Sequence, residues 1–450
     1  MKARGAVSAW PVETGRSAWL ALAAQRRPHP ALQGQQHADF LVIGAGFAGL
    51  TAARRLTEQC PEARVVVLEA QTIAEGPAGR NSGYMIDVPH DLSSGEYASA
   101  AAEATALDIA RNRVAIDYAK AIAAHCGMDA HTFDPSGKVN AAATERGLQH
   151  NQNYAESLSR IGEVHRLLDA QAMRDLTGSR HYLGGLYTPG AVMIQPAEYM
   201  HALAQSLCPH VGLFEQSPVT HLAREGGVWT ARTPQGAVSA PRVILAVNGH
   251  LQHFGHVRGR LMHVFTYASM SEGMAAHSRE AAQTGAPRWA LLPADPMGAT
   301  VRKITDRQGQ ARILVRTRFT YDPSMAVSMA RVQAIARTQH QSMIARFPEL
   351  AAVPMAFSWA GRLCLSLNQV PVFGEIDSGL FSACVSNGLG TVKGTLAGLW
   401  AADLAAGRPT AEALAYADQA PPKRLPPEPL AWLGVNAAIR WQEWRAGAEA

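Results

Sequence analysis

The sequence predicts an α/β fold of two interleaved domains, one of them built on a parallel sheet. The chain has 450 residues, 47% of them hydrophobic, which is enough for a large core and more than a single domain usually holds. A short apolar run, residues 40–43, leads into a glycine-rich turn over residues 44–49, and a helical pattern follows. A second apolar run, residues 65–68, ends at Glu69. Such runs are typical of strands buried on both faces of a sheet.

The three glycines of this turn have separate tasks in a dinucleotide-binding motif. Gly44 allows the tight turn, and Gly46 lets the backbone approach a pyrophosphate at the positive end of the next helix. Gly49 lets that helix pack closely on the preceding strand. The strand before the turn and the helix through Leu56 supply the context that a chance Gly-x-Gly-x-x-Gly lacks. The motif therefore predicts a Rossmann-like domain.

Glu69 supports the same interpretation. It stands twenty residues after Gly49, at the end of the second apolar run. An acidic side chain there can accept hydrogen bonds from the hydroxyls of an adenosine ribose. The carboxylate also argues against a nucleotide that carries a 2′-phosphate.

Composition and charge exclude several classes of partner. The net charge of +5 is modest and the basic residues are scattered, so we expect no nucleic-acid partner. No apolar run approaches 20 residues, so we expect no stable membrane insertion. The apolar patch at residues 18–24 is short for a secretion signal, and two arginines follow it closely. Five cysteines without CxxC spacing suit a reducing compartment, and we expect a cytoplasmic protein.

Helical and strand patterns alternate along the middle of the chain. Ala-rich, charge-dotted patterns predict long helices over residues 99–127 and 144–177. Between them, residues 133–141 predict a hairpin-like pair of strands. Pro196 opens a further helix that runs to Ala204.

The rest of the chain is predicted to be rich in strands. These are expected at residues 214–222, 228–233, 238–246, 261–270 and 380–385. A small-residue helix is expected over residues 391–405, after a Gly-x-Gly turn. The last segment, residues 421–444, reads as an extended arm that ends in an amphipathic helix, and we expect this helix to dock on the protein itself.

Four segments together carry a family resemblance. They are the turn at residues 44–49, the loop Gly79-Arg-Asn-Ser-Gly83, the strand and turn at residues 244–249, and the block from Trp359-Ala-Gly361 to Gly374 with the Gly-x-Gly turn and helix after it. The chain resembles the FAD-dependent oxidoreductases of the D-amino-acid oxidase, glycine oxidase and sarcosine oxidase superfamily. Within that superfamily, the short segments Ser17-Ala-Trp19, Pro30-Ala-Leu-Gln-Gly34 and Ala38-Asp39 resemble gamma-glutamylputrescine oxidoreductases and their relatives.

The resemblance implies a Rossmann-like FAD-binding domain interleaved with a substrate domain on a mixed or antiparallel sheet. The implied division is an N-terminal extension (1–37), an FAD-binding domain (38–110, 190–250 and 355–408), a substrate domain (111–189 and 251–354) and a C-terminal arm (409–450). The implied reaction oxidises the C–N bond of an amine or modified amino acid by hydride transfer to flavin N5, and water hydrolyses the imine. Oxygen or an electron carrier would reoxidise the flavin.

The resemblance also implies a set of cofactor-binding residues. These are Gly44, Gly46, Phe47, Ala48, Gly49, Glu69, Ala70, Arg80, Asn81, Ser82, Val219, Asn248, Gly388, Leu389, Gly390 and Thr391. The turn at residues 388–390 opens a helix whose positive end could stabilise charge on a reduced flavin.

Three departures from the family pattern bear on the substrate and on flavin attachment. The arginine that clamps a substrate carboxylate in relatives has Leu363 at its equivalent position, with Arg362 beside it. Lys393 is near the place of a substrate-binding lysine, but an offset of one residue turns a helical side chain by about 100°. The loop at Arg80 lacks the histidine that binds flavin covalently in some relatives, and Cys364 aligns with a proline. These departures favour non-covalent FAD and an amine, or an amino acid held by different contacts.

Catalytic candidates are few, since hydride transfer from a neutral amine needs positioning more than a strong acid or nucleophile. We expect Tyr267 and Arg302 to orient the substrate, and Lys303 to promote reaction with oxygen. His253, His256 and His263 are weaker candidates, because 17 histidines offer many chance placements. No metal site is predicted, because histidines and acids do not occur at ligand spacing.

Two other functions stay open from the sequence. A flavin-dependent monooxygenase would share the nucleotide domain, but it should have a further NADPH-related glycine motif, which we do not find. A non-catalytic flavin-binding protein would hold FAD that no amine reduces.

Overall fold

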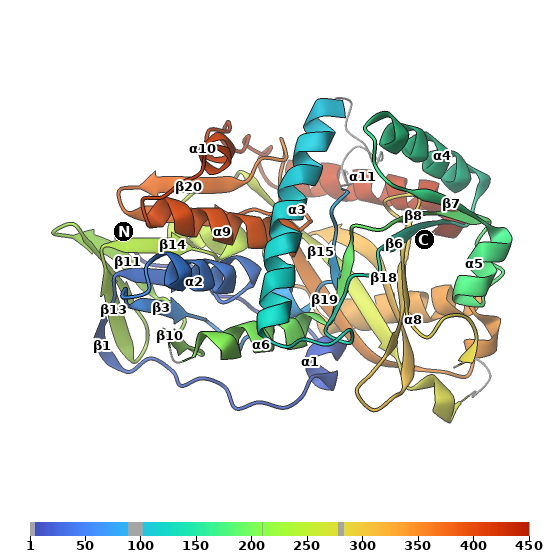
Figure 1. Cartoon of the computed structure of the whole chain (residues 1–450), viewed down its shortest axis with the longest axis horizontal. Coiled ribbons are helices and arrows are strands. Elements are labelled where there is room, and N and C mark those ends of the chain that lie inside the picture. Colours follow the sequence, from blue (N-terminus) through green and yellow to red (C-terminus); the bar gives the residue numbers. More distant parts are fainter. Residues whose placement is uncertain (1–4, 89–101, 209, 278–282, 450) are drawn as a thin grey trace.

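The computed structural model describes residues 5–88, 102–208, 210–277 and 283–449. Two large sheets form the molecule, a six-stranded sheet at the left of Figure 1 and an eight-stranded sheet at the right. The long helix α3 (Ala102–His125) crosses the front of the molecule between them. The predicted α/β class, with a parallel nucleotide-type sheet and a second mixed sheet, is confirmed.

The six-stranded sheet has the order β10-β3-β2-β14-β21-β20. Its strands are β10 (Val211–Phe214), β3 (Val65–Leu68), β2 (Phe40–Ile43), β14 (Arg242–Leu245), β21 (Leu380–Cys384) and β20 (Val372–Asp377). All neighbours pair in parallel except β20, which is antiparallel to β21. Both β2 and β3 are buried along their whole length, as their continuous apolar runs predict.

Two helices of small residues cover this sheet and contact each other. They are α2 (Phe47–Gln59) and α9 (Val392–Ala405). The helices approach so closely at Gly398 that a Cβ there would lie 2.1 Å from the carbonyl oxygen of Ala48. The helix predicted over residues 391–405 is therefore present, and its small side chains allow this contact.

The eight-stranded sheet has the order β19-β15-β18-β17-β16-β6-β8-β7. Its strands are β19 (Met355–Ser366), β15 (Leu261–Ser271), β18 (Ala311–Tyr321), β17 (Thr300–Thr305), β16 (Trp289–Pro293), β6 (Lys138–Ala142), β8 (Gly184–Thr188) and β7 (Arg166–Asp169). Every pair is antiparallel except β16 and β6. The sheet is therefore mixed but mainly antiparallel.

Two smaller sheets and the remaining helices complete the described fold. The small sheets have the orders β1-β13-β12-β11 and β4-β9-β5. Their strands are β1 (Gly34–His37), β13 (Gly236–Ala240), β12 (Val228–Arg232), β11 (His221–Glu225), β4 (Tyr84–Met85), β9 (Val192–Ile194) and β5 (Phe133–Asp134). The remaining α-helices are α1 (Ala18–Leu22), α4 (Glu145–Arg160), α5 (Ala170–Thr177), α6 (Pro196–Leu207), α8 (Met329–Arg346), α10 (Ala411–Ala417) and α11 (Leu430–Ala446).

Four local predictions were wrong. Residues 214–222 do not form one strand, because β10 ends at Phe214 and β11 begins at His221, and the two strands belong to different sheets. Residues 144–177 do not form one helix, because β7 at residues 166–169 joins the edge of the large sheet and separates α4 from α5. Residues 133–141 supply two strands that pair elsewhere, β5 with β9 and β6 with β8 and β16. The run at residues 238–246 is divided between β13 and β14, which belong to different sheets. In each case distant partners decide the pairing.

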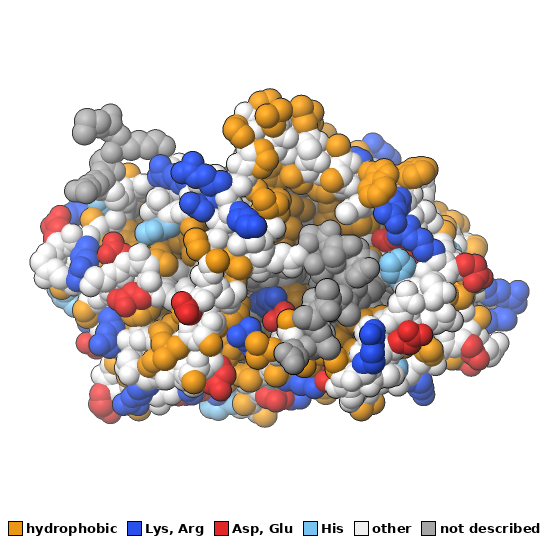
Figure 2. All heavy atoms as spheres, turned by 90° about the horizontal axis from the view of Figure 1, so that it is seen from above, with side chains coloured by type: hydrophobic (Ala, Val, Ile, Leu, Met, Phe, Trp, Pro, Cys, Tyr) orange, Lys and Arg blue, Asp and Glu red, His pale blue; other side chains and the backbone are white. Residues whose placement is uncertain are grey.

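The division into domains remains a proposal. The six-stranded sheet takes strands from all three segments proposed for the FAD-binding domain, but β19, in the third of them, pairs in the eight-stranded sheet. The C-terminal helix α11 docks through Ala431 and Ala446, while Trp441 and Trp444 are exposed. Figure 2 shows apolar, basic and acidic side chains interspersed over the face seen from above. Among the described residues, no helix combines the length and apolarity needed to cross a membrane.

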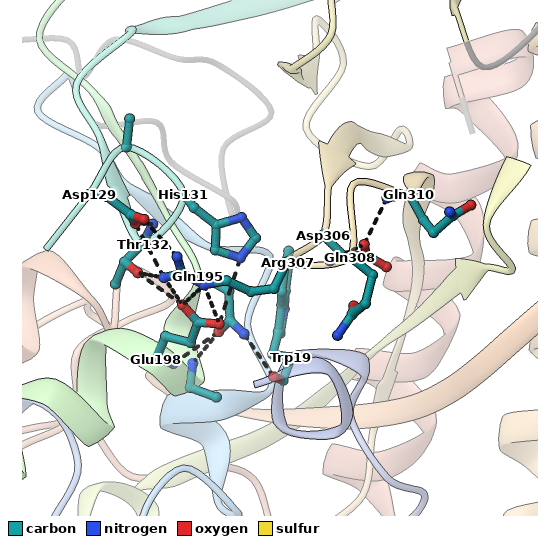
Figure 3. A network of polar contacts seen from close by, with 12 residues as sticks. Trp19, Asp129, His131, Thr132, Gln195, Glu198, Asp306, Arg307, Gln308 and Gln310 are labelled. Carbon is teal, nitrogen blue, oxygen red and sulfur yellow. Dashed lines mark hydrogen bonds and ion pairs between the residues drawn. The ribbon is translucent and has the colours of Figure 1, made fainter. Parts of the chain in front are cut away.

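A cluster of charges ties α6 to the loop between β17 and β18 (Figure 3). The guanidinium group of Arg307, in that loop, lies 2.6 Å from a carboxylate oxygen of Glu198 on α6 and 2.6 Å from one of Asp129. The Thr132 hydroxyl donates to Glu198 at 2.9 Å. Burial opposes ionisation of Glu198, but hydrogen bonds from His131, Arg307 and Thr132 outweigh it and lower the pKa of Glu198 to about 2.

We expect Glu198→Gln to destabilise the protein in a pH-dependent way. The folded-state pKa lies below the ordinary value of 4.5, so the ionised carboxylate stabilises the fold fully above pH 4.5 and loses this effect as the pH falls toward 2. With a discount for the half-exposed Arg307, the loss should be about 1–2 kcal/mol at pH 7 and smaller at pH 3. Urea unfolding at both pH values measures it, with the exposed Glu62→Gln as control. An equal loss at both pH values would contradict the assignment.

Candidate cofactor and substrate site

One large cavity lies at the carboxyl ends of the parallel strands. It has a volume of about 290 Å³ and is lined by the turns that follow β2, β3, β14 and β21. In open α/β sheets this edge is where ligands bind, since loops and helix N-termini converge there. The cavity continues from this edge to the eight-stranded sheet, where side chains of β15, β16 and β18 line it.

The first turn has the geometry that the glycine motif predicts. Gly44 adopts a φ of +102°, and a Cβ on Gly49 would lie 1.7 Å from the Gly44 carbonyl oxygen. Gly46 is different, because a Cβ there would meet nothing closer than 3.8 Å and the residue lines the cavity. Gly46 is also the N-cap of α2 and, as a glycine, has no side chain that could cap that helix. The first N–H groups of α2 therefore face the cavity beside Phe47 and Ala48.

Glu69 lies at the end of β3 and lines the cavity with Ala70. Its carboxylate accepts hydrogen bonds from the backbone N–H groups of Ala45 at 2.8 Å and Gln71 at 2.9 Å. Burial raises the pKa of Glu69, although these hydrogen bonds act against the increase. The side chain is thus fixed between two turns at the cavity wall.

A second helix begins at the same cavity. Residues 388–391 line it, and Gly388 adopts a φ of +89° at the entry to α9. The N-cap residue Thr391 does not cap α9 with its side chain, because its hydroxyl donates to the carbonyl oxygen of Tyr84 instead. Asn248 also lines the cavity and accepts a hydrogen bond from the backbone N–H of Val385 at 3.0 Å. Two uncapped helix N-termini, those of α2 and α9, thus meet one cavity.

The loop at residues 80–83 is held by side chains from three distant segments. The indole N–H groups of Trp19 and Trp359 donate to carbonyl oxygens in this loop at 2.8 and 3.0 Å. Arg302 donates to two more, at 2.7 and 2.8 Å. Arg80, Asn81 and Ser82 line the cavity, so these contacts fix one of its walls.

An N-terminal strap, defined here as residues 7–16, lies against the cavity, which its first residues line. Trp10 lines the cavity and donates from its indole nitrogen to the carbonyl oxygen of Val219 at 2.9 Å. The carboxylate of Glu13 lies 2.8 Å from the guanidinium group of Arg362 and 3.5 Å from that of Arg80. All three charged side chains are at most 5% exposed. A buried ion cluster therefore fastens the strap.

The far end of the cavity forms a compartment of mixed character. It is lined by Tyr84, Ile86, Thr266, Leu292, Arg316, Phe319 and Leu389. Most of this lining is apolar, and its polar groups come from β4, β15 and β18. Such a lining is typical of small-molecule sites, in which a few polar groups fix the orientation of a ligand.

The structure brings the predicted cofactor residues together and leaves the predicted catalytic residues outside the cavity. Gly49 packs on Gly44, and all the other predicted cofactor residues line the cavity. The Tyr267 hydroxyl lies 2.7 Å from that of Thr320, away from the lining. Arg302 donates hydrogen bonds to carbonyl oxygens of the loop at residues 80–83, and Lys303 donates to the carbonyl oxygen of Thr284 at 2.7 Å. These three side chains thus have structural partners.

The clamp and histidine candidates are placed as follows. Arg362 and Leu363 both line the cavity, but Arg362 is paired with Glu13. The ammonium group of Lys393 lies 3.9 Å from a carboxylate oxygen of Asp108, outside the lining. None of the three candidate histidines lines the cavity.

Sequence reasoning missed Tyr84, Thr266, Arg316, His250 and the strap. Tyr84 directly follows the glycine loop, and that position was its only local signal. Arg316 is a charged residue within a mainly apolar strand pattern, which could have identified it. Burial and the nearby charges of Arg362 and other histidines lower the pKa of His250 to about 2, so this cavity histidine is neutral. Within the described ranges, no three His, Cys, Asp or Glu side chains are grouped for a metal ion.

Comparison with known proteins identifies the family. The family model described as FAD dependent oxidoreductase matches residues 39–404. The chain belongs to this family of FAD-dependent oxidoreductases. It is 26% identical over 402 residues to the probable oxidoreductase OrdL of Haemophilus influenzae, covering 82% of this chain and 83% of that protein. It is 25% identical over 402 residues to the gamma-glutamylputrescine oxidoreductase of Escherichia coli, covering 87% and 89%.

Solved structures show the same fold. Glycine oxidase from Geobacillus kaustophilus matches with a TM-score of 0.66 and 18% identity, over 84% of this chain and 96% of that one. L-Amino acid deaminase from Proteus myxofaciens matches with a TM-score of 0.67 and 17% identity, over 90% and 97%. The match to the family model over residues 39–404 confirms the predicted superfamily, the enzymatic nature of the protein and its cofactor FAD.

We expect Gly46→Ala to weaken FAD binding without unfolding the apoprotein. The added methyl group has room in the protein but projects at the wall where α2 begins. The loss should be about tenfold or more in Kd. Quenching of flavin fluorescence during titration of the apoprotein measures it, and thermal unfolding checks the fold. Gly434→Ala, on an exposed turn of α11 with open space around it, is the control. Unchanged affinity in Gly46→Ala would contradict this placement of the cofactor.

Proposed function

We propose that this protein binds FAD non-covalently and oxidises a C–N bond of an amine or modified amino acid, giving an imine that water hydrolyses. One observation carries the proposal. A single cavity joins the wall formed by Glu69 and the N-terminus of α2, where a nucleotide would bind, to the compartment on the eight-stranded sheet. The relatives named gamma-glutamylputrescine oxidoreductase and glycine oxidase support a nitrogen-bearing substrate.

The residues around the cavity fit FAD in three places. The uncapped N-terminus of α2, with Gly44 to Gly49, would hold the pyrophosphate. Glu69 and Ala70 would lie at the adenosine ribose, with Val219 beside them. The loop at residues 80–82, Asn248 and the N-terminus of α9 at residues 388–391 would hold the flavin ring. FAD, when bound, supplies the two-electron acceptor that protein side chains lack.

Non-covalent attachment is supported by the chemistry of the cavity wall. Among the cysteines that the structure describes, Cys364 is the one that lines the cavity. Burial strongly raises the pKa of its thiol, so the nucleophilic thiolate is not formed at neutral pH. No histidine stands in the loop at residues 80–83.

The side chains in the compartment position the substrate and exclude water. Burial raises the pKa of Tyr84 and lowers that of His250, so neither group changes charge near neutral pH. The substrate amine must therefore reach its neutral form without a strong base from these two groups. Leu292, Leu389 and Phe319 provide apolar walls that keep water from the reacting carbon.

The expected result is that an amine or amino acid bleaches the flavin band when oxygen is excluded. The panel is polyamines, gamma-glutamylated amines, N-methyl amino acids and D-amino acids. Admitting air then separates an oxidase from an enzyme that needs another electron carrier. We place this protein in the cytoplasm. Reduction by NADPH alone would favour a monooxygenase, and FAD that no compound reduces would indicate a non-catalytic flavoprotein.

A further inference from the structure

The C-terminal helix α11, drawn in red in Figure 1, packs on the eight-stranded sheet through its inner face. This face joins an apolar cluster with β18 through Ala431, Val435, Ile439 and Ala446. These four residues lie on one side of the helix, because their spacings of four and seven residues are close to whole helical turns. The inner face therefore accounts for the docking of α11 on its own chain.

The outer face of α11 is apolar as well, but it is exposed. Leu433, Ala437, Trp441 and Trp444 follow one another at spacings of three or four residues, so they form one stripe. Leu433 stands two positions after Ala431, which places the stripe on the side opposite the inner face. Trp441 is 55% exposed and Trp444 is 78% exposed. A helix on a protein surface normally turns polar side chains outward, so an apolar outer face indicates a binding partner.

The charges beside this stripe are basic. Arg440 directly precedes Trp441 and Arg445 directly follows Trp444, so one exposed arginine lies on each side of the stripe. The guanidinium carbon of Arg445 lies 4.6 Å from the centroid of a Trp441 ring. Glu443 is the acidic residue of the helix, but it is buried and is shared by Arg440 at 2.7 Å and Arg318 at 3.0 Å. Since one carboxylate serves two arginines, positive charge remains at the outer face.

The arm that leads to α11 carries charge of the same sign. Lys423 and Arg424 are exposed there. Glu428, just before the helix, accepts hydrogen bonds from the Tyr321 hydroxyl at 2.6 Å and from the backbone N–H of Trp432 at 3.1 Å. The partner of the outer face should therefore combine an apolar layer with negative charge.

A second copy of this chain fits that description poorly. A two-fold contact sets the same patch against itself, so the arginines of the two copies would be brought together. The surface of a bilayer with anionic lipids fits better, because it attracts lysine and arginine side chains. Tryptophan prefers the boundary between lipid headgroups and acyl chains, where its ring is in apolar surroundings and its indole N–H meets polar groups.

We propose that the outer face of α11, with Arg440 and Arg445 beside it, binds the surface of a bilayer that contains anionic lipids and holds the folded enzyme there as a peripheral protein. Leu433, Trp441 and Trp444 would enter the headgroup region, and the helix would lie in the plane of the membrane. The inner face would keep its contacts with β18. The proposal does not depend on the proposed function, because the described cavity lining contains no residue of α11.

Binding of the FAD-loaded protein to vesicles tests the proposal. The vesicles contain phosphatidylcholine alone or an equal mixture of phosphatidylcholine and phosphatidylglycerol, and sedimentation measures the bound share. Wild type should bind the mixed vesicles about tenfold or more tightly at low salt. This preference should shrink at high salt, because salt screens charges at the membrane surface.

Two variants separate the apolar and the charged contributions. Trp441→Ser combined with Trp444→Ser should weaken binding to the mixed vesicles about tenfold or more. Arg445→Gln should weaken it about fivefold and should also reduce its dependence on salt. All of these side chains are exposed, so thermal unfolding and FAD content should stay as in wild type.

The matched controls lie on α8, which packs on the other side of the eight-stranded sheet (Figure 1). Met329→Ser removes an exposed apolar side chain there, and Arg337→Gln removes an exposed arginine. Both variants should bind vesicles as wild type does.

Several results would overturn the proposal. These are no binding of wild type to either kind of vesicle, equal binding to both kinds at low salt, and an equal loss of binding in the α8 controls. A further contrary result is a dimer in solution that Trp441→Ser with Trp444→Ser converts to a monomer, while wild type binds no vesicles. A second copy of the chain would then cover the outer face of α11.

Discussion

The close contact between Gly49 and Gly44 is the constraint on which the site depends. A Cβ on Gly49 would lie 1.7 Å from the Gly44 carbonyl oxygen, so only glycine lets α2 begin directly at the end of β2. A second contact of this kind, at Gly398, places α9 against α2. Two close backbone contacts, each allowed by a glycine, thus direct two helix N-termini into one cavity, where their partial positive charges favour an anionic cofactor.

The cofactor half of the site could be predicted because its information is local. The glycine turn, Glu69 and the turn at residues 388–390 each lie within a short stretch whose strand and helix patterns are readable. The substrate half depends on pairings between distant strands. Tyr267 and Arg302 had the right residue types, but a sequence pattern does not say which face of a long strand meets the cavity. The strap carried no local motif, since its role comes from contacts more than 200 residues away.

Several buried residues hold the walls of the site in place and are not themselves placed to contact a ligand. Trp19, Trp359 and Arg302 fix the loop at residues 80–83 through its carbonyl oxygens. In the strap, Glu13 forms ion pairs with two buried arginines, Arg80 and Arg362. The chain keeps the family's cofactor motif, while Leu363 lines the cavity at the position expected for the family's clamp arginine.

The most direct test of the account is the rate of anaerobic flavin reduction in a single turnover, with a substrate amino acid carrying hydrogen or deuterium on the carbon bonded to nitrogen. If the C–N bond is oxidised by transfer of that hydrogen to the flavin, deuterium should slow the bleaching of the flavin band. Equal rates for the two substrates, when the concentration of each is saturating and binding is not limiting, would contradict the central claim that this cavity carries out oxidation at carbon.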